Sequence, residues 1–488
     1  MVFIDFSALN VALPAIQKDL NISSQSLLWI INIYVLFLSS LMLVAGSMGD
    51  LYGRKKVFIV GIFIFAIASL LCGLSPGIEM LIASRGLQGI GGALMIPGSL
   101  SIISSVIPSE RRGKAFGTWS TFSALTTTAG PVLGGWLAGT GLWRLIFYIN
   151  LPLAIFTILA LFTKVPESRD DSAKKLDITG AILATFGLGG MTYGFLEASE
   201  TSFGEIRVIL SLTLGFIFLI SFILTELKSD HPMLPLHLFK SRTFSGVNVL
   251  TLFMYTALNA SLFFYPLNLV QVQGYSETSA GLATLPFAIL ISVMSRFSGV
   301  YADKFGVRKP LIVGPIISAF GLFLMTLPGL TGGPSEYWET FFPAILFLGI
   351  GMGIIVAPLT VAVMASVPSH NTGIASGINN TMARIAGLIA IALLGMVIIL
   401  SFKNNLEEFA DKQNIPPEIK TALIDSSNKL GETRPPAHLD IQQKEKISSD
   451  IKYSFVGAFN LIVLISVILS ILSSVTAFFT VENGIVKE

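Results

Sequence analysis

Charged residues and cysteines are scarce in this sequence, and each shortage excludes a class of protein. Only 12% of the 488 residues are charged, against about a quarter in soluble domains, and 53% are hydrophobic, which excludes a soluble enzyme. A single cysteine excludes an intrachain disulfide. The four histidines do not stand at the spacings typical of metal-binding motifs, so the sequence indicates no metal site. A formal charge of +2 is too small to indicate a nucleic-acid partner. The composition is that of an integral membrane protein.

Apolar runs of about 20 residues are abundant instead, and a helix needs that length to cross ~30 Å of hydrocarbon. We predict fourteen membrane helices, at residues 1–16, 28–48, 57–75, 80–106, 118–138, 145–162, 178–196, 206–224, 245–270, 280–300, 310–327, 341–365, 373–402 and 455–481. They group into an N-terminal six-helix half (1–164), a central helix pair with flanking loops (165–243) and a C-terminal six-helix half (244–488). The predicted fold class is an all-α polytopic membrane protein.

Lysine and arginine are concentrated in every second short loop. The basic loops lie at 54–56, 111–114, 164–175, 228–242 and 304–309, whereas the alternate loops hold only Lys18, Arg144 and Arg207. Because positive residues are retained on the cytoplasmic side, we expect both termini in the cytoplasm. Residues 403–453 would then lie outside the cell. With eight basic residues, nine acidic residues and two Pro-Pro pairs, they predict a solvated linker rather than an independent domain.

A loop pattern occurs twice, each time after the second helix of a six-helix block. Its members stand 253 residues apart and pair Gly46 with Gly299, Asp50 with Asp303, and Gly53 with Gly306. Two homologous halves predict a transporter whose site lies between them, with the central helix pair as an insertion. Asp50 ends a helix whose carbonyl end is already negative, so we expect a cation or the N-terminus of another helix beside it.

Two membrane segments present small residues to a neighbouring helix. On the fourth helix, one face carries residues at i, i+3, i+4 and i+7, namely Arg85, Gln88, Gly89 and Gly92. An arginine near mid-membrane has to face protein or water, and the glycines permit close approach of another backbone. On the fifth helix, two adjacent i, i+4 rows favour tight packing and a kink, and they consist of Gly130, Pro131, Gly134 and Gly135.

Asp5 is the only acid that the predicted helices place deep in the membrane. It stands 13 residues (18 − 5) before Lys18, which marks the outer surface, and at ~1.5 Å per residue that is ~20 Å down. An ionised carboxylate is costly at that depth, so Asp5 is suited to binding and releasing a proton as its surroundings dry and wet. The alternative is an aspartate that stays paired with an arginine.

These segments resemble the major facilitator superfamily, and more narrowly its fourteen-helix drug:proton antiporter branch. The loop 46–55 is similar to the superfamily's cytoplasmic signature, residues 130–135 to the antiporter signature, and residues 5–14 and 143–152 to segments of the fourteen-helix branch. The antiporter pattern expects glycine where this chain has Thr126, so the tight face is expected to be shorter. The resemblance implies that Asp5 and Arg85 couple protons. It also implies a cytoplasmic gate formed by Gly46, Asp50, Gly53, Arg54, Lys55, Asp303 and Arg308.

We therefore expect a secondary active transporter in the cell membrane, the inner one where there are two. It would export small amphiphilic compounds or drugs in exchange for protons, as a monomer, by alternating access and without a cofactor. The nearest alternatives are a symporter of the same superfamily and a dedicated metabolite or lipid exporter, and the 130–135 signature favours exchange over symport. A receptor or membrane enzyme is a remote alternative, since no nucleophile, base and orienter set is visible.

The deep charges predict the substrate class. Besides Asp5 and Arg85, we place Arg296 and Arg384 within helices, so a cavity lined by them would prefer neutral, zwitterionic or weakly acidic amphiphiles over dications. Aromatic contacts are expected from Tyr255, Phe263 and Phe264. Because Asp5 stands so close to Met1, we also expect the natural chain to begin about ten residues upstream, which would complete the first crossing.

Overall fold

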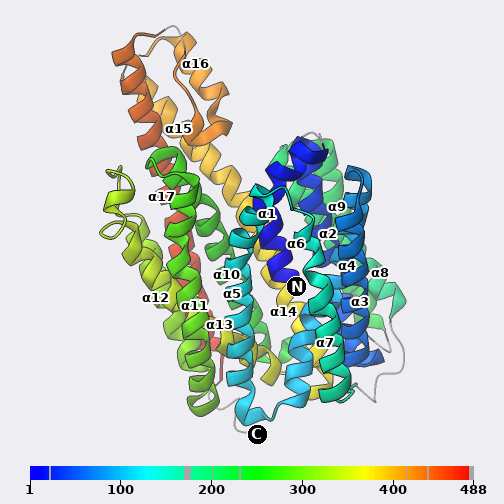
Figure 1. Ribbon diagram of the computed structural model, residues 1–488. Helices are drawn as coiled ribbons and strands as arrows, with labels where there is room; N and C mark the ends of the chain where they lie inside the picture. Colours follow the sequence, from blue (N-terminus) through cyan, green and yellow to red (C-terminus); the bar gives the residue numbers. More distant parts are fainter. Residues whose placement is uncertain are drawn as a thin grey trace.

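The chain folds into an elongated bundle of helices that run side by side (Figure 1). The computed structural model describes residues 1–20, 24–169, 177–201, 203–229, 232, 234–413, 415–436 and 439–482, and this part of the chain contains helices and no strand. Eleven of the described helices are long and apolar enough to cross a membrane. The chain is therefore a multi-pass membrane protein, as its composition predicts.

The first block comprises α1 (Val2–Leu20), α2 (Ser24–Tyr52), α3 (Arg54–Leu74), α4 (Ile78–Val106), the short turn η1 (Ser109–Arg111), α5 (Arg112–Gly139), α6 (Leu145–Tyr148) and α7 (Asn150–Lys164). Two further helices follow, α8 (Ile178–Glu200) and α9 (Ile206–Lys228). They pack on each other, and α8 also packs on α2. Most of the predicted basic loop 164–175 precedes them, and its residues from 170 onward lie outside the described residues.

The last block begins with η2 (Leu236–Lys240), α10 (Arg242–Leu267) and the π-helical turn η3 (Asn268–Val272). It continues with α11 (Glu277–Phe305), α12 (Arg308–Met325), η4 (Pro334–Glu336), α13 (Phe341–Ala365), η5 (Ser369–Asn371) and α14 (Thr372–Ile389). The π-helical turn η6 (Ala390–Leu394) joins α14 to α15 (Gly395–Lys412), and α16 (Pro417–Asp425), η7 (Ser427–Glu432) and α17 (Ile441–Thr480) complete the chain.

Each of the fourteen predicted windows falls on these helices, but three are missing from the eleven apolar ones. The windows 1–16, 118–138 and 373–402 correspond to α1, α5 and the α14–α15 region. The described residues of α1 provide a shorter apolar helix, Val2–Leu13, whereas α5 and α14 carry polar residues such as Thr121 and Arg384. They also pack closely on other helices, α5 on α1 and α11, and α14 on α2 and α10. Contacts with other helices shield these polar side chains, which would be unfavourable in contact with lipid.

The segment 403–453 differs from the solvated linker that its charge and prolines predict. The helix α15 extends well into it, α16 follows Pro416, and a capping box at Asp440 starts α17, so most of the stretch is helical. Apolar residues of these helices join the core of the C-terminal block, among them Leu406, Leu423 and Ile447. The region rises above the rest of the bundle in Figure 1. The linker prediction is wrong because the spacing of apolar residues, and not net charge, decides whether such a segment packs.

Two helix pairs make the most extensive contacts between the first and last blocks, α2 with α14 and α5 with α11. At each crossing a glycine faces a glycine, Gly46 against the backbone of Gly373 and Gly113 against the backbone of Gly299. A side chain at any of these positions would collide with main-chain atoms of the partner helix. The two halves of the repeat therefore meet at equivalent points, through main-chain contact.

The glycine rows of α5 pack on the helix that carries Asp5. A Cβ atom at Gly134 would lie 2.7 Å from the main-chain carbon of Ala8, and one at Gly130 would lie 2.9 Å from the Ala8 nitrogen. Gly135 lies beside Val11 of the same helix. The tight face that the sequence predicts is therefore the contact between α5 and α1.

Gly134→Val should push α1 away from α5 and destabilise the protein by about 1–3 kcal/mol, as overpacking does in other cores. Thermal unfolding of the detergent-solubilised protein would measure the effect. Gly139→Val is the matched control, because a Cβ atom at Gly139 on the same helix meets no other atom within 4 Å. An unfolding midpoint equal to that of the control would contradict the close contact of α5 with α1.

Candidate functional site

Asp5 and Arg85 form an ion pair inside the N-terminal block. Asp5 Oδ2 of α1 and Arg85 Nη1 of α4 are 2.5 Å apart, and both side chains are 0% exposed. Arg85 Nε also donates to the carbonyl of Ile30 in α2, at 3.2 Å. Two opposite charges are tolerated at this depth because each neutralises the other. Asp5 is thus paired with an arginine in this conformation and presents no surface to a substrate.

Three polar side chains complete the network around the pair. Gln88 Nε2 and Asn150 Nδ2 donate to Asp5 Oδ1 at 2.9 and 3.1 Å, and Gln88 Oε1 accepts from Arg85 Nη1 at 2.6 Å. Both amides also donate to Ser69 Oγ, at 3.2 and 2.9 Å. All five side chains are buried. The helices α1, α3, α4 and α7 therefore converge on a single carboxylate.

Tyr34 of α2 lies against the face of the Arg85 guanidinium, whose carbon is 4.2 Å from the ring centroid. Gly89 of α4 permits this contact, because a Cβ atom there would lie 2.6 Å from the Tyr34 carbonyl oxygen. Within the described part of the chain, three buried atoms of this region have no hydrogen-bond partner, namely Arg85 Nη2, the Tyr34 hydroxyl and Asn150 Oδ1. Buried polar atoms are usually paired, directly or through water.

Two members of this network, Asn150 and Ser69, are not among the residues that the sequence singles out. Asn150 lies in the segment 143–152, whose aromatic and basic residues suit an interfacial anchor. The missed signal is its distance of six residues (150 − 144) from Arg144, which places an amide ~9 Å inside the membrane. Ser69 gives no such signal, because serine is common where membrane helices pack.

Asp50, at the end of α2, contacts both an arginine and another helix. Its Oδ1 accepts from Arg54 Nε at 3.0 Å and Nη2 at 2.9 Å. The same carboxylate accepts from the main-chain N–H groups of Gly373 at 3.0 Å and Ile374 at 2.8 Å, where α14 starts. Asp50 therefore sits on the positive end of a helix from the opposite block. Both kinds of partner that its position requires are present.

The second copy of the loop makes a related contact with fewer partners. Asp303, near the end of α11, accepts from the main-chain N–H groups of Gly113 at 2.6 Å and Lys114 at 2.8 Å, where α5 starts. Arg308 does not join it, because Arg308 Nη2 donates to the carbonyl of Phe478 in α17 at 2.9 Å. The repeat therefore preserves the carboxylate on a helix N-terminus and omits the arginine.

Lys55 belongs to the first copy of the loop (46–55), and it contacts neither the Asp50 nor the Asp303 carboxylate. Its Nζ donates to the carbonyl of Val165 at 2.7 Å, while the main-chain N–H groups of Lys55 and Lys56 donate to the Glu167 carboxylate at 3.0 and 3.1 Å. Glu167 thereby caps α3. Gly53, with a φ of 107°, makes the sharp turn from α2 into α3 that returns Arg54 to Asp50.

The residues expected from the sequence to contact substrate are spread over the C-terminal block. On α10, Tyr255 is partly buried, Phe264 is buried, and Phe263 is 46% exposed. Arg296 is exposed on α11, whereas Arg384 on α14 is only partly exposed. In the described part of the chain, none of them forms a hydrogen bond with the five residues around Asp5.

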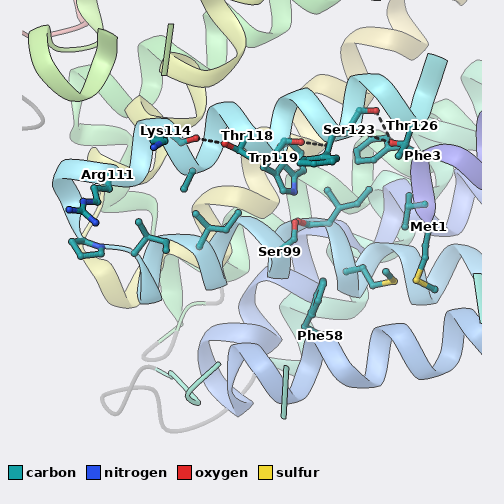
Figure 2. Close-up of a pocket in the computed structure, with 18 residues that line it drawn as sticks. Met1, Phe3, Phe58, Ser99, Arg111, Lys114, Thr118, Trp119, Ser123 and Thr126 are labelled. Carbon is teal, nitrogen blue, oxygen red and sulfur yellow. Dashed lines mark hydrogen bonds between the residues drawn. The ribbon is translucent and has the colours of Figure 1, made fainter. Parts of the chain in front are cut away.

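A groove of about 750 Å³ lies between α3, α4 and α5, beside the start of α1 (Figure 2). Most of its walls are apolar, with Phe58 of α3 and Trp119 of α5 on opposite sides. Arg111 and Lys114 stand at one end and Met1 at the other, as Figure 2 shows. The five residues of the buried network do not line it. The groove and the ion pair are thus separate features of the N-terminal block.

Comparison with known proteins gives the family. The chain matches the Major Facilitator Superfamily over residues 1–391. It is 29% identical over 438 residues to the multidrug resistance protein Stp of Mycobacterium tuberculosis (strain CDC 1551 / Oshkosh), an alignment that covers 88% of this chain and 80% of that protein. It is 28% identical over 486 residues to the tetracenomycin C resistance and export protein of Streptomyces glaucescens, with coverages of 98% and 89%.

A solved structure shows the same fold. The proton:xylose symporter XylE, bound to 6-bromo-6-deoxy-D-glucose, superposes with a TM-score of 0.58 at 14% sequence identity, over 98% of this chain and 92% of that one. The family match, the helical bundle and the repeated loops that join its two blocks lead to one conclusion. The chain belongs to the Major Facilitator Superfamily, and it is a membrane transporter and not an enzyme.

Proposed function

We propose that this transporter is a drug:proton antiporter that exports small amphiphilic compounds. The observation that carries the proposal is the Asp5–Arg85 pair, because a titratable carboxylate beside unpaired polar atoms is costly inside a membrane unless transport uses it. The relatives support the direction of transport, since one is named a multidrug resistance protein and another a resistance and export protein. The proton gradient supplies the energy, with no cofactor.

Asp5 couples protons by changing what Arg85 has to bind. The ionised carboxylate accepts from Arg85 and from two amides. Protonation removes its charge, which leaves Arg85 as an uncompensated charge in a medium of low dielectric. That state favours a rearrangement of α1 against α4, and release of the proton restores the pair. Because the pair is sealed from solvent, coupling acts through conformation rather than through competition with the substrate.

Asp50 and Asp303 form the gate at one end of the bundle, Asp50 between α2 and α14 and Asp303 between α11 and α5. Each carboxylate accepts two N–H groups from the other block, so each contact has to break before that end of the bundle opens. Arg54 orients Asp50 and makes the first contact the stronger one. The gate therefore biases a conformational equilibrium without touching the substrate.

We further propose fourteen crossings with both termini in the cytoplasm. The two six-helix halves (1–164 and 244–488) then flank the inserted pair (165–243), and the end that carries Asp50 and the basic loops 54–56 and 111–114 faces the cytoplasm. The region 403–453 lies on the outer side. The transporter works as a monomer in the cell membrane, because each chain contains both halves.

Asp5→Asn keeps the size of the side chain and removes the proton site. Export driven by a pH gradient in proteoliposomes should fall to background while the protein still inserts. Asp19→Asn is the matched control, because Asp19 lies on the same helix, is 47% exposed and pairs with Arg144, so its loss should leave transport unchanged. Undiminished gradient-driven export by Asp5→Asn would remove Asp5 from the mechanism.

Asp50→Asn should slow turnover more than Asp303→Asn does, because Asp50 holds both a helix N-terminus and Arg54. Hydrogen bonds to a charged group contribute about 1.5–3 kcal/mol, so losing the charge shifts the gate towards opening. Transport rate and substrate affinity, measured separately, test this, and affinity should stay nearly constant. Parallel losses of affinity and rate would indicate misfolding and contradict a gating role.

Asn150→Leu removes the amide that donates to Asp5 and Ser69, and it should lower the unfolding free energy by about 1–3 kcal/mol. In an Asp5→Asn background, Asn150→Leu should lower the unfolding free energy by less, because no carboxylate is then left without its hydrogen-bond donor. Thermal unfolding of the four proteins of this double-mutant cycle gives the coupling. Thr157→Val on α7, whose hydroxyl donates to Leu153 of its own helix, should be additive with Asp5→Asn. If the losses of unfolding free energy from Asn150→Leu and Asp5→Asn simply add, Asn150 does not stabilise the Asp5 carboxylate.

A further inference from the structure

Arg384 lies where α14 passes the part of α2 that carries Tyr34. Two close approaches set the register of these helices, Gly46 against Gly373 and Met42 against Gly377. From the first contact to the second, the residue number on α2 falls by four while that on α14 rises by four, so the two helices are antiparallel. Continued along both helices, this register places residue 34 of α2 opposite residue 385 of α14. Arg384 and Tyr34 interact electrostatically, as this register requires. Tyr34 is therefore close to Arg85 from its own block and to Arg384 from the other.

Tyr255 stands on α10 at the level of Arg384. The hydroxyl of the adjacent Thr256 donates to the carbonyl of Ala386 in α14, at 3.4 Å. Tyr255 is only partly buried, and the Thr256 contact places it on the stretch of α10 that packs against the part of α14 carrying Arg384. Arg384 thus lies near Tyr34 where the two blocks meet, with α10 and its Tyr255 packed on the same helix.

The charges in this region do not balance. Arg85 has Asp5 as its counterion at 2.5 Å, whereas no ion pair of Arg384 occurs in the described part of the chain. Of the two guanidinium groups near Tyr34, only Arg85 has an ion-pair partner in the described part of the chain, and its Nη2 is buried without an acceptor. A partly buried cation in the middle of a membrane helix is costly unless something supplies the opposite charge.

We infer that Arg384 binds an acidic oxygen group of the transported compound, such as a carboxylate, sulfonate or phenolate. The guanidinium fork matches two such oxygens, and Tyr255 contacts the apolar body beside them. The inference rests on the proposed export function and names its substrate class as amphiphiles with one negative charge. Cationic analogues bind weakly, because Asp5 is sealed behind Arg85 and offers them no carboxylate.

The test uses three probes with the same naphthalene body and different charges: a carboxylate, its primary amide and a trimethylammonium. Binding to the purified full-length protein is measured by fluorescence, and gradient-driven transport is measured in proteoliposomes. Arg384→Gln removes the charge, and Arg384→Lys keeps the charge but loses the fork. Arg207→Gln, which removes an exposed charge from α9, is the control. Monodisperse gel filtration confirms that each variant is folded.

The wild-type protein should bind the carboxylate best and the trimethylammonium least. Arg384→Gln should weaken carboxylate binding about tenfold or more, as expected for a hydrogen-bonded charge, and change amide binding less than about threefold. Arg384→Lys should fall between, and Arg207→Gln should match the wild type. If Arg384→Gln is misfolded, the carboxylate-to-amide ratio of Arg384→Lys decides alone.

An unchanged carboxylate-to-amide ratio in both Arg384 variants would overturn the inference, as would a wild-type protein that binds the trimethylammonium best. An equal loss of carboxylate binding in Arg296→Gln would assign the charge to α11 and also overturn it. The proposed export function fails separately, if the wild-type protein moves neither the carboxylate nor the amide in response to a pH gradient. Binding and coupling are thus judged by different measurements.

Discussion

The ion pair between Asp5 and Arg85 is the constraint from which much of the N-terminal block follows. Removing one partner of a buried pair costs about 3–5 kcal/mol, so the helices that carry the two charges cannot move apart freely. The small residues of α4 and α5 meet this demand, because Gly89 lets α2 approach the arginine and Gly134 lets α5 hold α1. Motifs far apart in the sequence thus serve one electrostatic requirement.

The positions of the helices are predictable from the sequence because hydrocarbon thickness imposes a length on every crossing. The importance of Asp5, Arg85 and Asp50 is predictable too, since a charged side chain in an unfavourable position needs an oppositely charged or hydrogen-bonding group beside it. Their partners are not. Asn150 belongs to a segment that suits an interfacial anchor, and Arg308 turns to Phe478 instead of Asp303. Such pairings depend on how helices rotate against one another, which hydropathy does not encode.

The region 403–453 marks a different limit of sequence interpretation. Its balanced charge and paired prolines are typical of a solvated segment, and the first proline pair does separate α15 from α16, which begins at Pro417. On each of the helices in this region, however, buried apolar residues stand four apart, as Phe402 and Leu406, Ile419 and Leu423, and Ile447 and Ile451 do, and they extend the core of the C-terminal block. The average composition of fifty residues does not reveal the spacing of apolar residues within two helical turns, which is what decides whether a helix packs.

The helix α17 runs without interruption from the membrane part into this protruding region (Figure 1). Its 40 residues span ~60 Å at ~1.5 Å per residue. Near its C-terminal end it packs on α10 and α12, and near its start it contacts η7. Because of this length, a tilt of α17 by about 10° displaces one end relative to the other by about 10 Å. Small rotations of the C-terminal block are therefore magnified into a displacement at the tip that a pair of spectroscopic labels can resolve.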